Sequence, residues 1–256
     1  MAKINVDYYQ SKYFTFNKPV QWKGLTLHPI KVKDWLEFAS CCVVLDLNKN
    51  ETDNIEIIQM NYLKWLIIMS LTEDENGELG FGDYVMPKLY RILVLCFSVD
   101  DIEVSLDEEY RAFIRIGKVK LSPKDFDEFR ILVMYQNLSE YEEKKIIDSD
   151  LQKAIDDYND LVNRDIEIPS LERQIVVLAN ERHVMEETIF EMPYRKFKMA
   201  LDEIIGKLDY QINKTAERSG MVEFKQPIDH WIYKAKKNKN AVIGAVDYSE
   251  LESKIK

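Results

Sequence analysis

The chain has 256 residues, of which 46% are hydrophobic, and this content suits a protein with a folded core rather than a disordered one. Its 35 Lys and Arg against 45 Asp and Glu give a formal charge of −10, which disfavours general binding to polyanions because phosphate neutralisation needs an excess of cations. Only 8 residues are glycine, which disfavours glycine-rich phosphate loops and all-β repeats.

The three cysteines indicate a reducing compartment. Cys41 and Cys42 are adjacent and Cys96 is distant, and all three stand in apolar runs, unlike the paired cysteines of a disulfide framework. The first residues lack the continuous apolar segment of a signal peptide. The longest apolar runs, residues 65–69 and 92–97, are much shorter than the ~20 residues that cross a bilayer. We therefore expect a soluble intracellular protein without membrane contact.

The N-terminal part predicts a β-hairpin. Residues 13–16 and 19–22 are expected to be extended, and Lys23-Gly24 offers a two-residue turn. Residues 25–27 alternate between apolar and polar side chains, as a half-buried strand does. His28-Pro29 then ends the hairpin, because proline cannot donate to a strand ladder.

Three helices are expected next. Asp34 and Glu37 have the spacing of a capping box at the start of the first helix. A single second helix is expected over residues 55–69, with its apolar last turns in the centre of the core. Pro87 is expected in the first turn of the third helix. The buried face of that helix is expected to carry Leu89, Ile92, Leu93, Cys96 and Phe97.

The middle of the chain predicts a small antiparallel meander. Apolar residues alternate over residues 102–106, 112–116 and 119–121, with a turn at Gly117. Ser122-Pro123-Lys124-Asp125 then predicts a helix start, with a serine N-cap, a proline at the first helical position and an acid at the third.

The C-terminal half is expected to be helical. Residues 139–160 hold eight acidic and three basic side chains, and an amphipathic helix with an acidic outer face is expected over 151–162. Pro169-Ser170 begins another helix, and Pro193 opens a long one that ends at Gly220. The apolar positions of the long helix are Tyr194, Phe197, Leu201, Ile204, Ile205, Leu208 and Ile212.

These patterns predict an α+β fold that is predominantly α-helical, with an N-terminal β-hairpin, a small central antiparallel meander and a helical C-terminal half. The expected division is an N-terminal domain at 1–137, a helical domain at 138–237 and a flexible tail at 238–256, where periodicity is weak.

Motifs for catalysis, metal binding and cofactor binding are missing from the sequence. His28, His183 and His230 each stand alone, without the paired spacing of zinc ligands. The acidic pairs Asp100-Asp101 and Asp156-Asp157 are interpreted as solvated surface. Nucleotide-binding glycine motifs and a G-x-S-x-G nucleophile motif do not occur. We expect no catalytic, cofactor or metal site, and thus a protein that is not an enzyme.

Two sets of residues could bind partners. Methionines gather in the C-terminal part, either as ordinary core filling or as a surface that adapts to a protein client. With nearby aromatic residues they form the predicted partner-binding set, Met185, Met192, Met199, Met221, Phe224, Trp231 and Tyr233. Lysines interleave with aromatics over residues 225–240, which carry a net charge of +4. This candidate polyanion site consists of Lys225, Lys234, Lys236, Lys237 and Lys239, and the alternative is a cationic segment that docks on the acidic helix of the chain itself.

Several short pieces of the chain carry a resemblance to a known family. They are Asp209-Tyr210-Gln211-Ile212, Thr215-Ala216-Glu217, Ser219-Gly220-Met221-Val222, Pro227-Ile228-Asp229-His230-Trp231 and, near the N-terminus, residues 27–35. Residues 186–233 resemble the C-terminal part of tail assembly chaperones of long-tailed bacteriophages, and together with residues 27–35 they cover about a quarter of the chain. The genes of these proteins lie beside the tape-measure gene in phages of Gram-positive hosts.

The resemblance implies a non-enzymatic protein of the host cytoplasm that binds and solubilises the tape-measure protein. Many copies of the chaperone would coat the tape-measure protein until the tube subunits replace these copies. The implied partner is the tape-measure protein or another tail protein, and a second copy of the chain is a further candidate. A structural tail or neck component is one alternative. A nucleic-acid-binding accessory protein that uses residues 225–240 is another, although the acidic balance disfavours nucleic acid as a partner.

Overall fold

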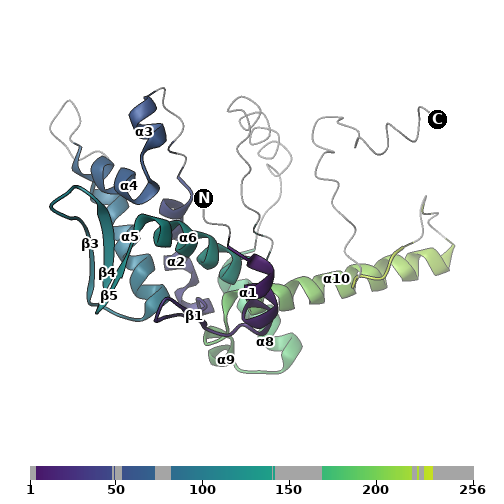
Figure 1. The fold of residues 1–256 in the computed structure, drawn as a ribbon. Coiled ribbons are helices and arrows are strands. Elements are labelled where there is room, and N and C mark those ends of the chain that lie inside the picture. The colour runs from purple at the N-terminus through teal and green to yellow at the C-terminus, as the bar shows by residue number, and fades with distance from the viewer. Residues whose placement is uncertain are drawn as a thin grey trace, which may run out of the picture. The chain divides into compact units, whose positions relative to one another are not determined.

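The structure is a computed structural model, and it describes residues 4–47, 49, 54–72, 82–139, 141, 169–220, 224 and 228–232. The described part is predominantly helical with two small antiparallel sheets, which confirms the predicted fold class (Figure 1). The chain divides into two units. The first comprises residues 1–143 and 175–199, and the second comprises residues 144–174 and 200–256.

The first unit begins with helices that precede the hairpin. Helix α1 (Val6–Lys12) is capped by the Asn5 side chain, which accepts the Tyr8 N–H at 3.0 Å. The sequence patterns did not predict this helix. The prediction of an extended segment at residues 13–16 was wrong, because Phe14–Phe16 forms the 3₁₀ helix η1. Phe14 is buried within this turn, and Asn17 closes it with a left-handed backbone. Burial of one aromatic ring has outweighed the strand propensity of its neighbours.

The predicted hairpin is confirmed, with strands β1 (Val20–Trp22) and β2 (Leu25–Leu27) in antiparallel register. Lys23 and Gly24 both have positive φ, at 50° and 80°, as a type I′ turn requires. His28 then donates its N–H to the Cys96 carbonyl at 2.8 Å. This hydrogen bond joins the end of the hairpin to the later segment that contains Cys96.

The helix after the hairpin, α2 (Trp35–Cys42), lies between the 3₁₀ turns η2 (Val32–Asp34) and η3 (Val43–Leu45). It begins where expected, but the capping box was wrong. The backbone of Asp34 is already helical, and its side chain makes no capping hydrogen bond. Glu37 instead forms an ion pair with Arg91, a residue of the later helix α5 (Gly82–Phe97).

The helix expected at residues 55–69 is two helices, α3 (Ile55–Gln59) and α4 (Tyr62–Leu71). Asn61 separates them, since its side chain accepts the Lys64 N–H at 2.8 Å and starts a new helix. Helix α5 (Gly82–Phe97) contains Pro87 as its sixth residue, so the predicted first-turn position was wrong. The predicted buried face of α5 is confirmed at all five positions.

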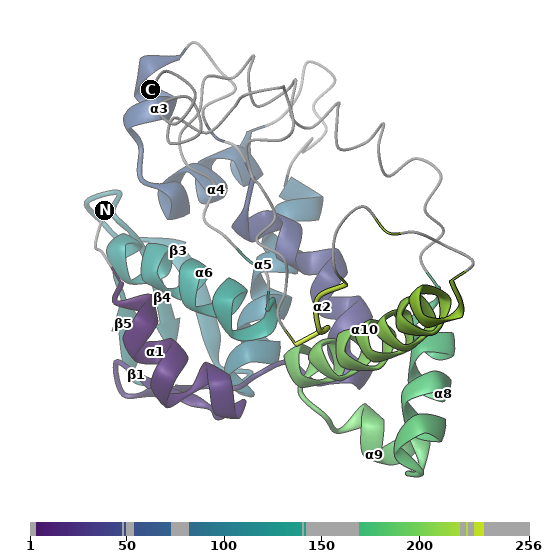
Figure 2. The same cartoon turned by 90° about the vertical axis from the view of Figure 1, so that its right-hand side faces the viewer.

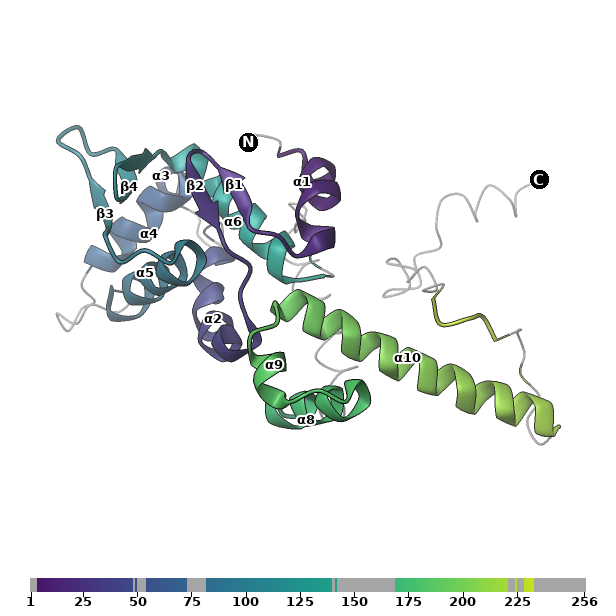
Figure 3. The same cartoon turned by 90° about the horizontal axis from the view of Figure 1, so that it is seen from below.

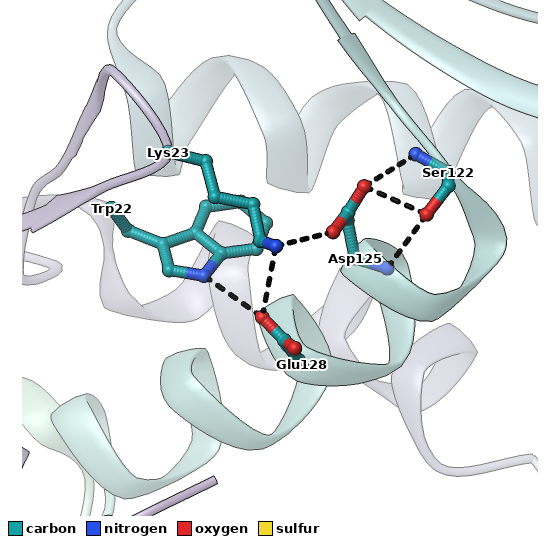
Figure 4. A network of polar contacts seen from close by, with 5 residues as sticks. All are labelled: Trp22, Lys23, Ser122, Asp125 and Glu128. Atoms are coloured by element: carbon teal, nitrogen blue, oxygen red, sulfur yellow. Dashed lines mark hydrogen bonds and ion pairs between the residues drawn. The ribbon is translucent and has the colours of Figure 1, made fainter. Parts of the chain in front are cut away.

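The meander is confirmed as strands β3 (Ile102–Leu106), β4 (Ala112–Ile116) and β5 (Val119–Leu121), in the order β3-β4-β5. Helix α6 (Pro123–Asn137) follows, and its predicted N-terminus is confirmed. The Ser122 Oγ accepts the Asp125 N–H at 3.3 Å, and the Asp125 carboxylate accepts the Ser122 N–H at 2.7 Å (Figure 4).

Ion pairs and a hydrogen bond connect the hairpin turn to the start of α6 (Figure 4). The Lys23 ammonium lies 2.6 Å from the Asp125 carboxylate and 3.5 Å from that of Glu128. The Trp22 indole N–H also donates to Glu128, at 3.3 Å. Although burial alone would raise the pKa of Asp125, hydrogen bonds from Lys23 and Ser122 hold it below its usual value.

The core of the first unit surrounds α6, whose Phe126, Phe129, Leu132 and Val133 are fully buried. Helix α5 lies beside α2 and α4 (Figure 2). The Phe97 and Phe129 rings stack with centroids 5.3 Å apart and both contact the Trp22 indole, which places the hairpin against α5 and α6.

Helices α8 (Leu171–Arg182), α9 (Glu186–Phe190) and α10 (Tyr194–Ser219) make up the described C-terminal part. The starts after Pro169-Ser170 and Pro193 are confirmed, as is the end at Gly220, whose φ is 67°. The expected helix at 151–162 lies outside the described residues. The division at 137 and 237 stays a prediction.

The turn between α9 and α10 binds to residues 30–35 within the first unit. The Val32 N–H donates to the Met192 carbonyl at 2.9 Å, and the Tyr194 N–H donates to the Ile30 carbonyl at 2.7 Å. The Tyr194 ring stacks on the Trp35 indole with parallel planes. The segment before α10 is therefore held by backbone hydrogen bonds as well as by packing.

Candidate functional site

The predicted partner-binding residues occupy several elements. Met185 is exposed at the N-cap of α9, and Met199 is exposed on α10. Met192 is half-buried between these helices, and its carbonyl accepts a hydrogen bond from Val32. Phe224 and Trp231 are half-buried. Met221, Tyr233 and all five lysines of the candidate polyanion site lie outside the described residues, and both sets stay predictions.

The part of α10 in the second unit carries an exposed apolar stripe made of Ile205, Leu208 and Ile212. Their side chains are 53%, 47% and 65% exposed. Because they are three and four residues apart, they lie along one side of the helix. Leu201 continues the same side and is buried, so only the later portion of the predicted apolar face is open. Sequence periodicity located this face but could not separate its covered portion from its exposed portion.

Charged and polar residues border the stripe. Asp202 and Asp209 are seven residues apart and follow one edge, while Gln211 and Arg218 follow the other. The exposed Asp209 on the first edge would attract a Lys or Arg carried beside the apolar face of a partner helix, as flanking charges do in coiled coils. The stripe therefore has an apolar centre with one acidic side.

The opposite side of α10 is covered by the chain itself, within the second unit. The Trp231 indole N–H donates to the Glu203 carboxylate at 2.7 Å, and its ring contacts the Tyr210 ring at 5.2 Å between centroids. The ring lies directly over Gly206, where an added Cβ would come within 3.4 Å of the Trp231 side chain. Trp231 and Tyr210 belong to two of the pieces that carry the family resemblance, and they are in contact here.

The second unit thus uses its aromatic residues on the polar side of α10 and leaves the apolar side exposed. Glu203, Gly206 and Tyr210 repeat at three and four residues, half a turn away from Ile205 and Leu208. A helix that served only the core would be covered on its apolar side first, because apolar burial is the main stabilising term. This reversal makes the stripe the candidate functional site.

Within the described part of the chain, no group of three or more His, Cys, Asp or Glu side chains could hold a metal ion. Burial raises the pKa of the Cys42 thiol and raises that of Cys96 well above its usual range, so both are protonated and weakly nucleophilic at neutral pH. Chemistry based on these two thiols is therefore disfavoured.

The described helices include none with the length and apolar content needed to cross a bilayer. Comparison with known proteins gave no match, whether to a family model, to a curated protein or to a solved structure.

Proposed function

We propose that the protein is a non-enzymatic tail assembly chaperone that binds and solubilises a phage tape-measure protein during tail assembly. Two observations support this proposal. Residues 186–233 resemble the C-terminal part of such chaperones, and the same region carries the exposed stripe of α10. The stripe is the observation on which the proposal rests, since exposed apolar patches bordered by polar residues mark sites of protein binding.

The spacing of the stripe suits an amphipathic helix as the client. Ile205, Leu208 and Ile212 stand at i, i+3 and i+7, which is the pattern by which helices pack along one another. Asp209 on the acidic edge would pair with a cationic residue on the client. A tape-measure protein, being a long helix with an apolar stripe, would offer many such sites along its length.

The size of the stripe suits a contact that can be released. Complete burial of an Ile or Leu side chain stabilises by about 1.5–3 kcal/mol, so three half-exposed side chains would add about 3 kcal/mol. A dissociation constant of 1 mM already corresponds to about 4 kcal/mol. One copy alone would bind weakly, and many copies along one client would be displaced stepwise as the tube grows.

Co-expression with the tape-measure protein of the same genome tests the proposal. The wild-type chain should keep this client in the soluble fraction, and Leu208→Asp should reduce the soluble amount several-fold because it places a charge in the apolar contact. Lys207→Gln makes the same one-unit change of charge at an exposed position on the other side of α10 and serves as the matched control. A client that is equally soluble with Leu208→Asp, or without the chain, would contradict the proposal.

A second measurement separates a chaperone from a structural component. Mass spectrometry of purified mature virions should detect little or none of this chain, because a chaperone leaves the client during tube growth. A stoichiometric amount in virions would instead favour a tail or neck component.

A further inference from the structure

Strand β3 is an edge strand of the meander in the first unit. The strand order β3-β4-β5 leaves one side of β3 without a hydrogen-bonded neighbour among the described strands. Figures 1 and 3 show β3 as the outermost strand, at the margin of this unit. An open edge presents backbone N–H and C=O groups that can pair with a strand of another chain.

The register of the β3–β4 ladder identifies the backbone groups that point outward. The Asp107 N–H donates to the Arg111 carbonyl at 3.0 Å, so these two residues form a hydrogen-bonded pair. Because such pairs alternate along an antiparallel ladder, Ser105 and Glu103 are the next residues of β3 that bond to β4. The residues whose N–H and C=O groups point away from β4 are Ile102, Val104 and Leu106.

Most of these outward groups are open. The Ile102 N–H donates to the Asp100 carbonyl at 3.0 Å, and the Leu106 carbonyl accepts the Ser105 hydroxyl at 3.3 Å. The N–H groups of Val104 and Leu106 have no hydrogen-bond partner in the part of the chain that the structure describes, and neither do the carbonyls of Ile102 and Val104. The edge therefore has donors and acceptors ready for one more strand.

The side chains of these three residues are also incompletely covered. Ile102, Val104 and Leu106 pack against the core but stay half-buried. Residues opposite one another in a ladder lie on the same face of the sheet. The opposite residues on β4 are fully buried, and they are Ala112, Ile114 and Ile116. The remaining exposure of β3 thus lies toward its open edge, where proline, a bulge or an inward-pointing charge would normally prevent pairing and none occurs.

We propose that β3 pairs with β3 of a second copy of the chain, antiparallel about a two-fold axis at Val104. The Val104 N–H would donate to the Val104 carbonyl of the other copy, and the Leu106 N–H would donate to its Ile102 carbonyl. Each bond forms twice by symmetry. Since the axis is perpendicular to the sheet, both apolar faces continue on one side, and Ile102 of one copy covers Leu106 of the other.

The sequence of β3 is complementary to itself in this register. Glu103, the one charged residue of the strand, lies opposite Ser105 of the other copy. Pairing about either neighbouring residue would place Glu103 opposite Glu103 or opposite Asp107 of the other copy, and like charges in such positions destabilise a ladder. Just beyond the strand, Asp101 would face Asp107, but each already forms an ion pair with an arginine of its own chain.

The pairing goes beyond the proposed function and does not depend on it, because it involves no residue of the α10 stripe. A contact along five residues is small beside the roughly 1,200 Å² of a stable interface. We therefore expect a reversible dimer whose population rises with protein concentration.

Sedimentation equilibrium of the full-length chain tests this dimer. The wild type should shift from monomer to dimer as its concentration rises. Ser105→Glu places an acid opposite Glu103 of the other copy, twice by symmetry, and should raise the dissociation constant roughly tenfold. Ser105→Lys places a cation there and should lower the dissociation constant. Lys118→Gln makes the same one-unit change of charge as Ser105→Glu at an exposed turn position, and this matched control should dimerise like wild type.

Amide hydrogen exchange, measured by NMR at low and high protein concentration, tests the register. Exchange of the Val104 and Leu106 N–H groups should slow as the concentration rises. The N–H groups of Glu103 and Ser105 bond to β4 and should exchange slowly throughout. Val104→Pro removes only an outward N–H and should abolish the dimer, with urea unfolding as the check that the variant folds. Should it not fold, Ser105→Glu and the exchange measurement still decide.

Several outcomes would overturn the inference. One is a wild-type chain that stays monomeric at every concentration, and another is a dimer that Ser105→Glu and Ser105→Lys leave unchanged. A third is protection of Val104 and Leu106 that appears only when a different protein is added. Leu208→Asp should reduce client solubility and leave the dimer unchanged, so failure of the proposed function and failure of this inference are read from separate measurements.

Discussion

Helices α6 and α10 both carry apolar residues at helical spacing, but only in α6 are these residues covered along the whole helix. In α6, Phe126, Phe129 and Leu132 are fully buried, and the Ile30 N–H and the Leu27 carbonyl bond to Asn137 and Gln136 near its end. In α10, full burial ends at Leu201 and Ile204 is half-buried, while the later apolar positions of the stripe are about half exposed. Apolar residues at helical spacing therefore belong to the core in one helix and to an exposed surface in the other.

The contrast predicts the largest effect for truncation of a core ring. Phe129→Ala should lower the free energy of unfolding by about 3–5 kcal/mol, because it removes a buried ring and leaves a cavity. Leu208→Ala on the exposed stripe should lower it by less than about 1 kcal/mol. Urea unfolding of both variants checks this difference, and an equal loss would mean that the stripe is covered and is not a binding surface.

The environment of α6 also predicts a dependence on pH. Tyr62 of α4 packs against Phe126 and donates its hydroxyl to the Val44 carbonyl at 3.0 Å, and burial raises its pKa to about 12. In the unfolded chain the same group ionises near pH 10. The neutral Tyr62 hydroxyl therefore stabilises the fold fully below pH 10. About 2–3 kcal/mol of the free energy of unfolding is lost as the pH rises to 12.

Tyr62→Phe provides the comparison for this effect. The stability difference between wild type and Tyr62→Phe should shrink or reverse between about pH 9 and pH 12, measured by urea unfolding at each pH. Parallel curves for the two proteins across that range would show that the pKa of Tyr62 is not raised by the fold.

The ends of the two helices predict a smaller difference. Ser122→Ala removes the N-cap of α6 and should lower the free energy of unfolding by about 1 kcal/mol. Thr215→Ala on α10 removes an exposed hydroxyl that bonds to the Gln211 carbonyl within the same helix, and it should change stability by less than about 0.5 kcal/mol. Equal losses from both variants, in thermal or urea unfolding, would argue against the capping role of Ser122.

The smallest effect is expected at the attachment before α10. Hydrogen bonds from Lys31 and Lys33 lower the pKa of Glu191 to about 2, although its side chain is largely exposed. Because the folded pKa is depressed, the stabilisation is present above the usual carboxyl pKa and is lost as the pH falls toward 2. Glu191→Gln should destabilise slightly at neutral pH and low salt, and high salt should abolish the difference. A loss that persists in high salt would contradict this screened ion-pair interpretation.

The sequence predicted well those elements whose signals are local. Lys23-Gly24 encodes its turn through backbone preferences of two residues, and Ser122 with Asp125 encodes a helix start within a single turn. The predictions failed where a distant residue decided the outcome. Glu37 could not complete a capping box because the backbone of Asp34 was already helical and Arg91 of α5 bound the carboxylate.

The candidate site divides in the same way. The sequence alone determined that α10 has an apolar side, because the 3.6-residue period of a helix places Ile205, Leu208 and Ile212 together. Two features of the site depend on tertiary packing, namely that Trp231 covers the other side and that the stripe is open. Periodicity follows from bonds within one helix, whereas exposure depends on which other segments fold against each residue.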